Sequence, residues 1–143
     1  MSSASGDGHD GTAPTPAVGA LTTGWRLALL VAWGAVIVGL AAVWAASRQI
    51  GLSTWWLAPG MDGVASVVRL TPFITPMTMV VLILLRQPRL WLVGLVAGTL
   101  TMVIGLGDLG RVDGLAVVEI LLGASGAAAS AAAWTGTYRD GRR

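Results

Sequence analysis

Four long apolar blocks constrain the fold of this chain more than any other feature of its sequence. The first block, residues 27–46, contains no charged residue, no hydroxyl and no side-chain amide. Three more blocks follow at residues 67–85, 90–106 and 115–134. About 20 helical residues are needed to cross a hydrocarbon core of about 30 Å. The blocks therefore predict four transmembrane helices.

The overall composition favours the same class. Of the 143 residues, 55% are hydrophobic and 11% are charged, and the mean hydropathy is +0.75. Charged residues make up about a quarter of an ordinary soluble domain. We therefore expect an all-α integral membrane protein with its helices in an up-down bundle and the lipid bilayer as its immediate partner. The basic residues are all arginine, and Ala and Gly are abundant. This pattern is typical of GC-rich bacterial genomes and suggests a bacterial plasma membrane.

The chain divides into three regions. Residues 1–24 are rich in Gly, Ser, Ala, Thr and Pro and contain no Lys or Arg, which predicts a disordered tail. Residues 25–135 form the expected transmembrane domain, and residues 136–143 form a short basic tail. A cleaved signal peptide is the alternative for the first block. However, the preceding region is acidic, and the block is longer than the usual signal core of about 7–15 residues.

The positions of the arginines predict the orientation in the membrane. Positive charges in short flanking segments mark the cytoplasmic side, and tryptophans mark both interfaces. One side of the expected bundle carries six arginines: Arg26, Arg86, Arg89, Arg139, Arg142 and Arg143. The other side carries three: Arg48, Arg69 and Arg111. Trp25, Trp91 and Trp134 fall on the first side, and Trp44, Trp55 and Trp56 fall on the second. We therefore expect both termini in the cytoplasm.

Proline and small residues predict how the helices pack. Pro72 and Pro76 predict a kink in the second helix, which a membrane span tolerates because neighbouring groups satisfy the freed carbonyls. Thr71, Thr75 and Thr78 lie on one stripe of that helix and offer hydroxyls for this purpose. Small residues let two helices approach closely. The third and fourth helices are therefore expected to form a tight hairpin through Gly94, Gly98, Gly123, Gly126 and Ser130.

Three acids lie near the end of that hairpin. Asp108 and Asp113 fall in the Gly-rich connection GDLGRVDG, which reads as a turn, and we expect both to be hydrated. Glu119 shares a helical stripe with Gly123 and Gly126, so it is expected to point into the bundle and to need a partner. Arg69 is the first candidate and Arg111 the second. The pair would be either a structural ion pair or a proton or cation site.

The connection between the first two helices contains the apolar cluster TrpTrpLeu, at residues 55–57. This cluster is too short to cross a membrane and too apolar for bulk water, so we expect it in the outer interface. A plain anchored loop is one interpretation. A lid or docking surface for a lipid or a partner is the other.

Several functional classes lack their required residues. The chain has no Cys, and its only His is His9 in the N-terminal tail, which argues against thiolate chemistry, bis-His haem and a Ser-His-Asp triad. The net charge of +2 without a strong basic cluster argues against nucleic-acid binding. We expect no enzymatic activity, no cofactor and no metal site. The expected function is an accessory or scaffold subunit that packs with partner membrane proteins, lipids or further copies of itself. The alternative is a small oligomeric transporter or channel that uses Glu119 as a proton or cation site.

Overall fold

Four helices account for most of the described chain. A computed structural model describes residues 20–57 and 65–137, and in these residues it contains no β-strand. The helices are α1 (Thr23–Ile50), α2 (Ala65–Leu84), α3 (Leu90–Leu106) and α4 (Asp113–Ala133), with two short 3-10 helices, η1 (Trp55–Leu57) and η2 (Trp134–Gly136). The prediction of an all-helical chain with four long helices is confirmed.

The helix ends follow local backbone signals. α1 extends about one turn beyond the predicted block at each end and stops at Gly51, whose φ of 69° is left-handed and closes the helix. α3 begins directly after Arg89, which has a φ of 58°, and it matches the predicted block. The tails predicted at residues 1–24 and 136–143 lie largely outside the described residues.

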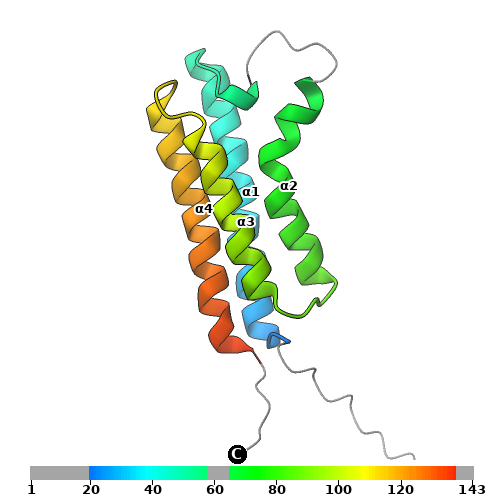
Figure 1. The fold of residues 1–143 in the computed structure, drawn as a ribbon. Helices are drawn as coiled ribbons and strands as arrows, with labels where there is room; N and C mark the ends of the chain where they lie inside the picture. The colour runs from blue at the N-terminus through cyan, green and yellow to red at the C-terminus, as the bar shows by residue number, and fades with distance from the viewer. Residues whose placement is uncertain (1–19, 58–64, 138–143) are drawn as a thin grey trace, which may run out of the picture.

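The helices form an antiparallel bundle in which each packs against its neighbours in the chain and α4 returns to α1 (Figure 1). α3 and α4 make the most extensive contact. The two ends of the described chain meet, because Leu21 and Thr137 form an isolated β-bridge. The amide of Thr22 also donates to the Gly136 carbonyl at 3.1 Å. Both ends therefore lie at the same end of the bundle, opposite the α3–α4 turn (Figure 1).

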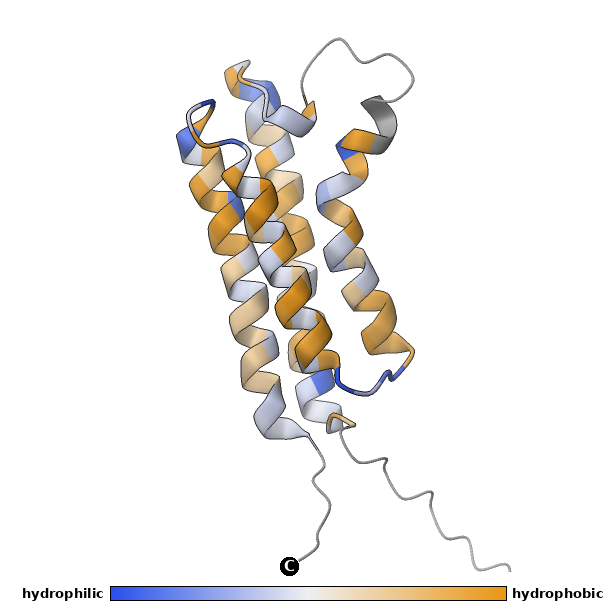
Figure 2. Cartoon of the chain, viewed as in Figure 1, coloured by the Kyte–Doolittle hydropathy of each residue, from blue (hydrophilic) through white to orange (hydrophobic). Residues whose placement is uncertain are grey.

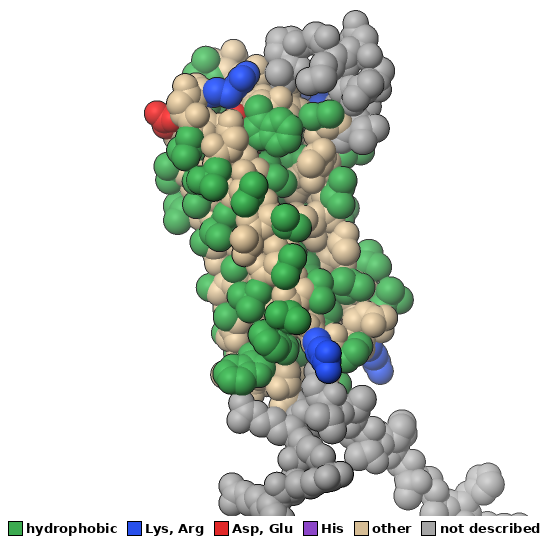
Figure 3. All heavy atoms as spheres, in the orientation of Figure 1, with side chains coloured by type: hydrophobic (Ala, Val, Ile, Leu, Met, Phe, Trp, Pro, Cys, Tyr) green, Lys and Arg blue, Asp and Glu red, His purple; other side chains and the backbone are tan. Residues whose placement is uncertain are grey.

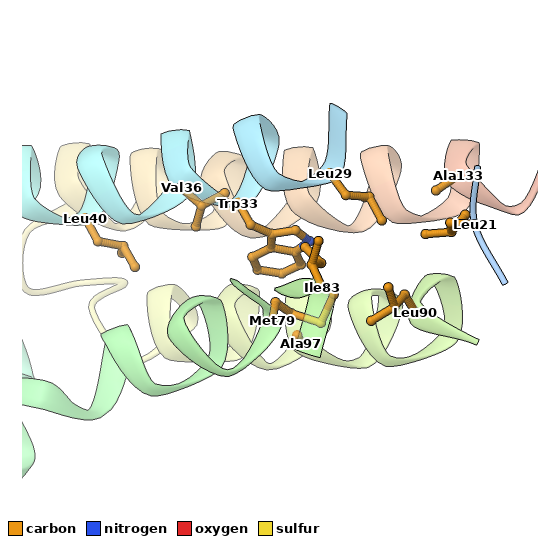
Figure 4. Close-up of a cluster of buried hydrophobic side chains, with 10 residues drawn as sticks. All are labelled: Leu21, Leu29, Trp33, Val36, Leu40, Met79, Ile83, Leu90, Ala97 and Ala133. Carbon is orange, nitrogen blue, oxygen red and sulfur yellow. The ribbon is translucent and has the colours of Figure 1, made fainter. Parts of the chain in front are cut away.

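The core follows a spacing of three and four residues along each helix. In α1 the buried positions are Leu29, Trp33, Val36, Leu40, Val43 and Ser47, which form one stripe facing the other helices. Trp33 lies near the middle of the main apolar cluster (Figure 4). Its indole Nε1 donates to the Ser130 hydroxyl at 3.3 Å. The bundle interior therefore combines a large aromatic side chain with a satisfied polar contact.

The outer surface of the bundle carries many large hydrophobic side chains. Large hydrophobic side chains are exposed on every long helix, for example Val38 at 69% and Leu121 at 62% (Figures 2 and 3). Two helical segments, Thr23–Ile50 and Asp113–Gly136, are long and apolar enough to cross a membrane. Val68–Leu84 and Leu90–Leu106 are shorter apolar helices.

α2 runs without interruption through its two prolines. Pro72 and Pro76 are both buried, on the side of α2 that faces the bundle. The Thr75 hydroxyl lies 3.1 Å from the Thr101 hydroxyl of α3. Thr75 therefore links two helices, whereas we had expected it to satisfy a carbonyl of its own helix. The kink at the prolines stays a prediction.

Small residues bring α3 and α4 into backbone contact. A Cβ on Gly98 would lie 2.7 Å from the Gly123 carbonyl oxygen, and a Cβ on Gly123 would lie 2.6 Å from the Met102 amide nitrogen. Gly94 lies against Ser130. Gly126 instead faces α1, because a Cβ there would lie 3.0 Å from the Trp33 ring. The structure thus places the expected packing residues at helix contacts, with Gly126 on a different neighbour.

Candidate functional site

Two carboxyl groups are buried at the end of the bundle that carries the α3–α4 turn. Asp108 lies in this turn and Glu119 lies in the second turn of α4, and both are 0% exposed. The backbone carbonyl of Asp108 accepts from the amides of Arg111 and Val112, each at 3.1 Å. Acidic side chains are almost never fully buried unless they are paired. The partners of these two groups are therefore central to any function at this end.

Both carboxyl groups accept hydrogen bonds from η1. The backbone amide of Trp55 donates to Asp108 Oδ1 at 2.7 Å. The indole Nε1 of Trp56 donates to Glu119 Oε1 at 3.1 Å. Trp55 makes one further bond, from its indole Nε1 to the Ile104 carbonyl at 3.1 Å. Two consecutive residues of the connection thus cover the α3–α4 end of the bundle.

Two glycines permit this close contact. A Cβ on Gly107 would lie 2.8 Å from the Trp55 indole nitrogen, and a Cβ on Gly105 would lie 2.9 Å from the Glu119 Cβ. Phe73 of α2 packs edge-on against Trp56, with ring centroids 6.3 Å apart and planes at 87°. The two carboxyl groups therefore lie between α3, α4 and the aromatic side chains of Trp55, Trp56 and Phe73.

Each carboxyl group keeps one oxygen without a donor. Among the residues that the structure describes, the buried oxygens Asp108 Oδ2 and Glu119 Oε2 have no hydrogen-bond partner, and neither does the buried Thr54 hydroxyl. The two carboxyl groups are near enough to interact with each other. Ionised carboxylates only accept hydrogen bonds. A direct bond between them therefore requires a proton on one of the two.

Burial raises the pKa of Asp108 above its ordinary value of 3.8. The hydrogen bond from the Trp55 amide and the positive charge of Arg111 act in the opposite direction and lower this pKa. Loss of solvation is the largest of these effects. The site therefore favours a protonated carboxyl more than bulk water does.

The two arginines expected as partners of Glu119, Arg69 and Arg111, are both exposed. Arg69 is exposed and lines an open pocket of about 480 Å³ together with Arg48 and Trp44. Arg111 is exposed in the turn and acts on Asp108 through its charge. The Glu119 carboxyl receives the Trp56 indole, and its second oxygen has no donor. The expected arginine partner of Glu119 is thus replaced by a tryptophan.

The two turn acids also differ from each other. Asp113 is exposed, and its Oδ1 accepts from the Gly110 amide at 2.6 Å, as expected for an acid at a wet helix start. Asp108 is buried, which corrects the expectation that it is hydrated. The sequence offered one signal for this burial, namely the apolar segment 55–57, which needs a surface to cover.

The chemistry available to this site is limited to a few groups. In residues 20–57 and 65–137 no group of three or more His, Cys, Asp or Glu side chains is arranged to hold a metal ion. Comparisons of this chain with protein-family models, with curated proteins and with solved structures give no match. The paired carboxyls can bind and release a proton, and they can hold the segment that covers them.

Proposed function

We propose that this chain is a small multi-pass protein of a bacterial plasma membrane that packs with a partner membrane protein as an accessory or scaffold subunit. The observation that carries the proposal is the apolar outer surface of all four helices. Large hydrophobic side chains on this surface are exposed while glycine, serine and threonine occupy buried positions. In water such a surface would be an unusually large apolar patch. Lipid and a partner helix both suit it.

The distribution of charge supports cytoplasmic termini. Arg26 donates to the Ile83 carbonyl at 2.9 Å, near the end of α2. Arg26 therefore lies beside the α2–α3 turn, which carries Arg86 and Arg89. Figure 3 shows basic side chains at both ends of the bundle and an apolar band between them. The described termini meet at the Arg26 end, and the sequence has three further arginines after Thr137, which favours the cytoplasmic side.

Photo-crosslinking in cells tests the accessory role. A photoreactive residue is placed at Val38, Leu84 or Leu121, which are exposed on α1, α2 and α4. A fourth variant carries it at the buried position Ala116 as the matched control. We expect a discrete protein adduct from at least one exposed position and none from Ala116. Lipid adducts alone at every exposed position would contradict the accessory role.

A second candidate is a small oligomeric transporter or channel with Glu119 as its proton or cation site. The buried carboxyl pair favours it, because an acid inside a membrane bundle commonly serves ion movement. Proteoliposome flux of protons or monovalent cations tests this function. Glu119→Gln should abolish the flux, and Asp113→Asn, which changes an exposed acid of the same region, should retain it. Equal flux in the two variants would contradict a role for Glu119.

A further inference from the structure

We propose that Asp108 and Glu119 share one proton, and that this proton site controls whether the Trp55–Leu57 segment stays bound to the α3–α4 end of the bundle. This role goes beyond an accessory function, since it gives the chain a proton-dependent change at one membrane face.

The first step concerns which carboxyl oxygens accept a hydrogen bond. Asp108 Oδ1 and Glu119 Oε1 are used by the donors of Trp55 and Trp56. The remaining oxygens, Asp108 Oδ2 and Glu119 Oε2, are buried and receive no donor from residues 20–57 and 65–137. An unsatisfied buried acceptor is costly. The two carboxyl groups interact with each other, so a proton on one of them can supply a donor to the other.

The surrounding charges carry the second step. Arg111 acts through its charge on Asp108, and it is exposed in the turn. α3 and η1 contain no ionisable side chain. Arg48 of α1 and Arg69 of α2 are exposed and line a pocket to which Leu57 of η1 also contributes, while Asp113 of α4 is exposed and binds the Gly110 amide. In the described part of the chain no buried cation balances two ionised carboxylates, so the second negative charge is disfavoured.

Loss of the shared proton to solvent changes the binding of η1. Both carboxyl groups are then ionised, and two buried like charges repel each other. Separating them moves the acceptors of the Trp55 amide and the Trp56 indole in opposite directions. The segment is therefore bound when the pair holds its proton and released when the proton leaves.

Cysteine accessibility measures this release directly, because the chain has no native Cys. Thr54 is 0% exposed and its hydroxyl has no partner among the described residues, so Thr54→Cys reports on the bound segment without removing a described hydrogen bond. Leu52→Cys, at a position 52% exposed, is the matched control for the intrinsic pH dependence of thiol reactivity. The readout is the ratio of the two maleimide labelling rates in full-length protein reconstituted into vesicles.

We expect this ratio to be low in acid and to rise by about tenfold per pH unit while a single proton titrates. Glu119→Gln keeps an oxygen for Trp56 and offers an amide donor to Asp108, so its ratio should stay low at every pH. Asp108→Asn should do the same from the other side of the pair, which provides a second test if one variant folds poorly. Asp113→Asn should retain the wild-type curve.

Three results would overturn the proposal. The first is a wild-type ratio that does not change with pH. The second is a wild-type pH curve in both Glu119→Gln and Asp108→Asn. The third is a ratio that follows the sodium concentration at fixed pH, which would assign the two free oxygens to a cation. None of these results bears on the accessory role, which the crosslinking experiment tests separately.

Discussion

At the scale of single residues, the contact between Trp56 and Glu119 is the most specific feature of the candidate site. The indole donor is 1% exposed and the carboxyl acceptor is 0% exposed, so neither group has water as an alternative partner. Removing the donor therefore leaves a buried acceptor without compensation. The resulting loss of stability is large only if the side chain at position 119 is still charged or polar.

Trp56→Phe tests this contact, because phenylalanine keeps an aromatic ring beside Phe73 and loses the donor. We expect a loss of about 1–3 kcal/mol in the free energy of unfolding. In a Glu119→Leu background the same substitution should cost less, since the acceptor is gone. Thermal unfolding in detergent of the four proteins of this cycle gives the coupling energy. Strictly additive effects would show that the bond contributes nothing to stability.

Asp108 gives the stability of the protein a defined dependence on pH. Its folded-state pKa is raised above 3.8 by burial, so the folded state binds this proton more tightly than the unfolded state does. The stabilising contribution of protonated Asp108 is therefore complete below pH 3.8 and is lost as pH rises through the raised pKa. The melting temperature of the wild-type protein should therefore fall as pH rises through this pKa. Asp108→Asn should make the fall less steep, and Asp113→Asn should leave it unchanged. An unchanged slope in Asp108→Asn would contradict the assignment.

At the scale of helices, the α3–α4 contact depends on backbone approach at glycine. Gly98 lies opposite Gly123 and Ala127, where an added Cβ would meet backbone atoms at 2.7 Å. Backbone cannot move aside as a flexible side chain can. By contrast, Gly34 of α1 has no atom within 4 Å of an added Cβ. Replacement by alanine therefore adds a methyl group against backbone atoms at Gly98 and in open space at Gly34.

Gly98→Ala should therefore lower the free energy of unfolding by about 1–3 kcal/mol through overpacking. Gly34→Ala should be neutral or should stabilise by up to about 1 kcal/mol, because alanine favours the helix over glycine. Melting in detergent measures both variants. Similar melting temperatures for the two would mean that α3 and α4 do not approach as closely as the structure indicates.

At the scale of the whole molecule, an apolar belt lies between two ends that carry the arginines (Figure 3). The described termini and the α2–α3 turn lie at one end, and the α3–α4 turn lies at the other (Figure 1). If the helices cross a membrane, these two ends face opposite compartments. The membrane orientation can then be tested with one introduced thiol at each end.

Single cysteines at Ser3, Thr137 and Leu109 test this orientation in intact cells. An impermeant thiol reagent should label Leu109→Cys, in the exposed part of the α3–α4 turn. It should label Ser3→Cys and Thr137→Cys only after the cells are opened. Labelling of either terminal position in intact cells would overturn the proposed cytoplasmic termini.

The number of helices, their approximate ends and the inward face of α4 could be predicted from the sequence. These properties are local: apolar blocks set where helices lie, and the repeat of small residues around Glu119 indicates which face a neighbour approaches. The four helices, the close α3–α4 contact and the burial of Glu119 with Gly123 follow from patterns within one or two segments. Such patterns are readable because they depend on residues three or four positions apart.

The contacts of the buried acids could not be predicted, because they depend on how distant segments fold together. Trp55 and Asp108 are 53 positions apart, and Trp56 and Glu119 are 63 positions apart. No local pattern links such residues, so charge complementarity suggested an arginine where the fold supplies an indole. The reason is geometric. The connection after α1 folds back over the end of the bundle and brings one donor to each carboxyl group. Arg69 stays exposed on α2, and Arg111 stays exposed in the turn.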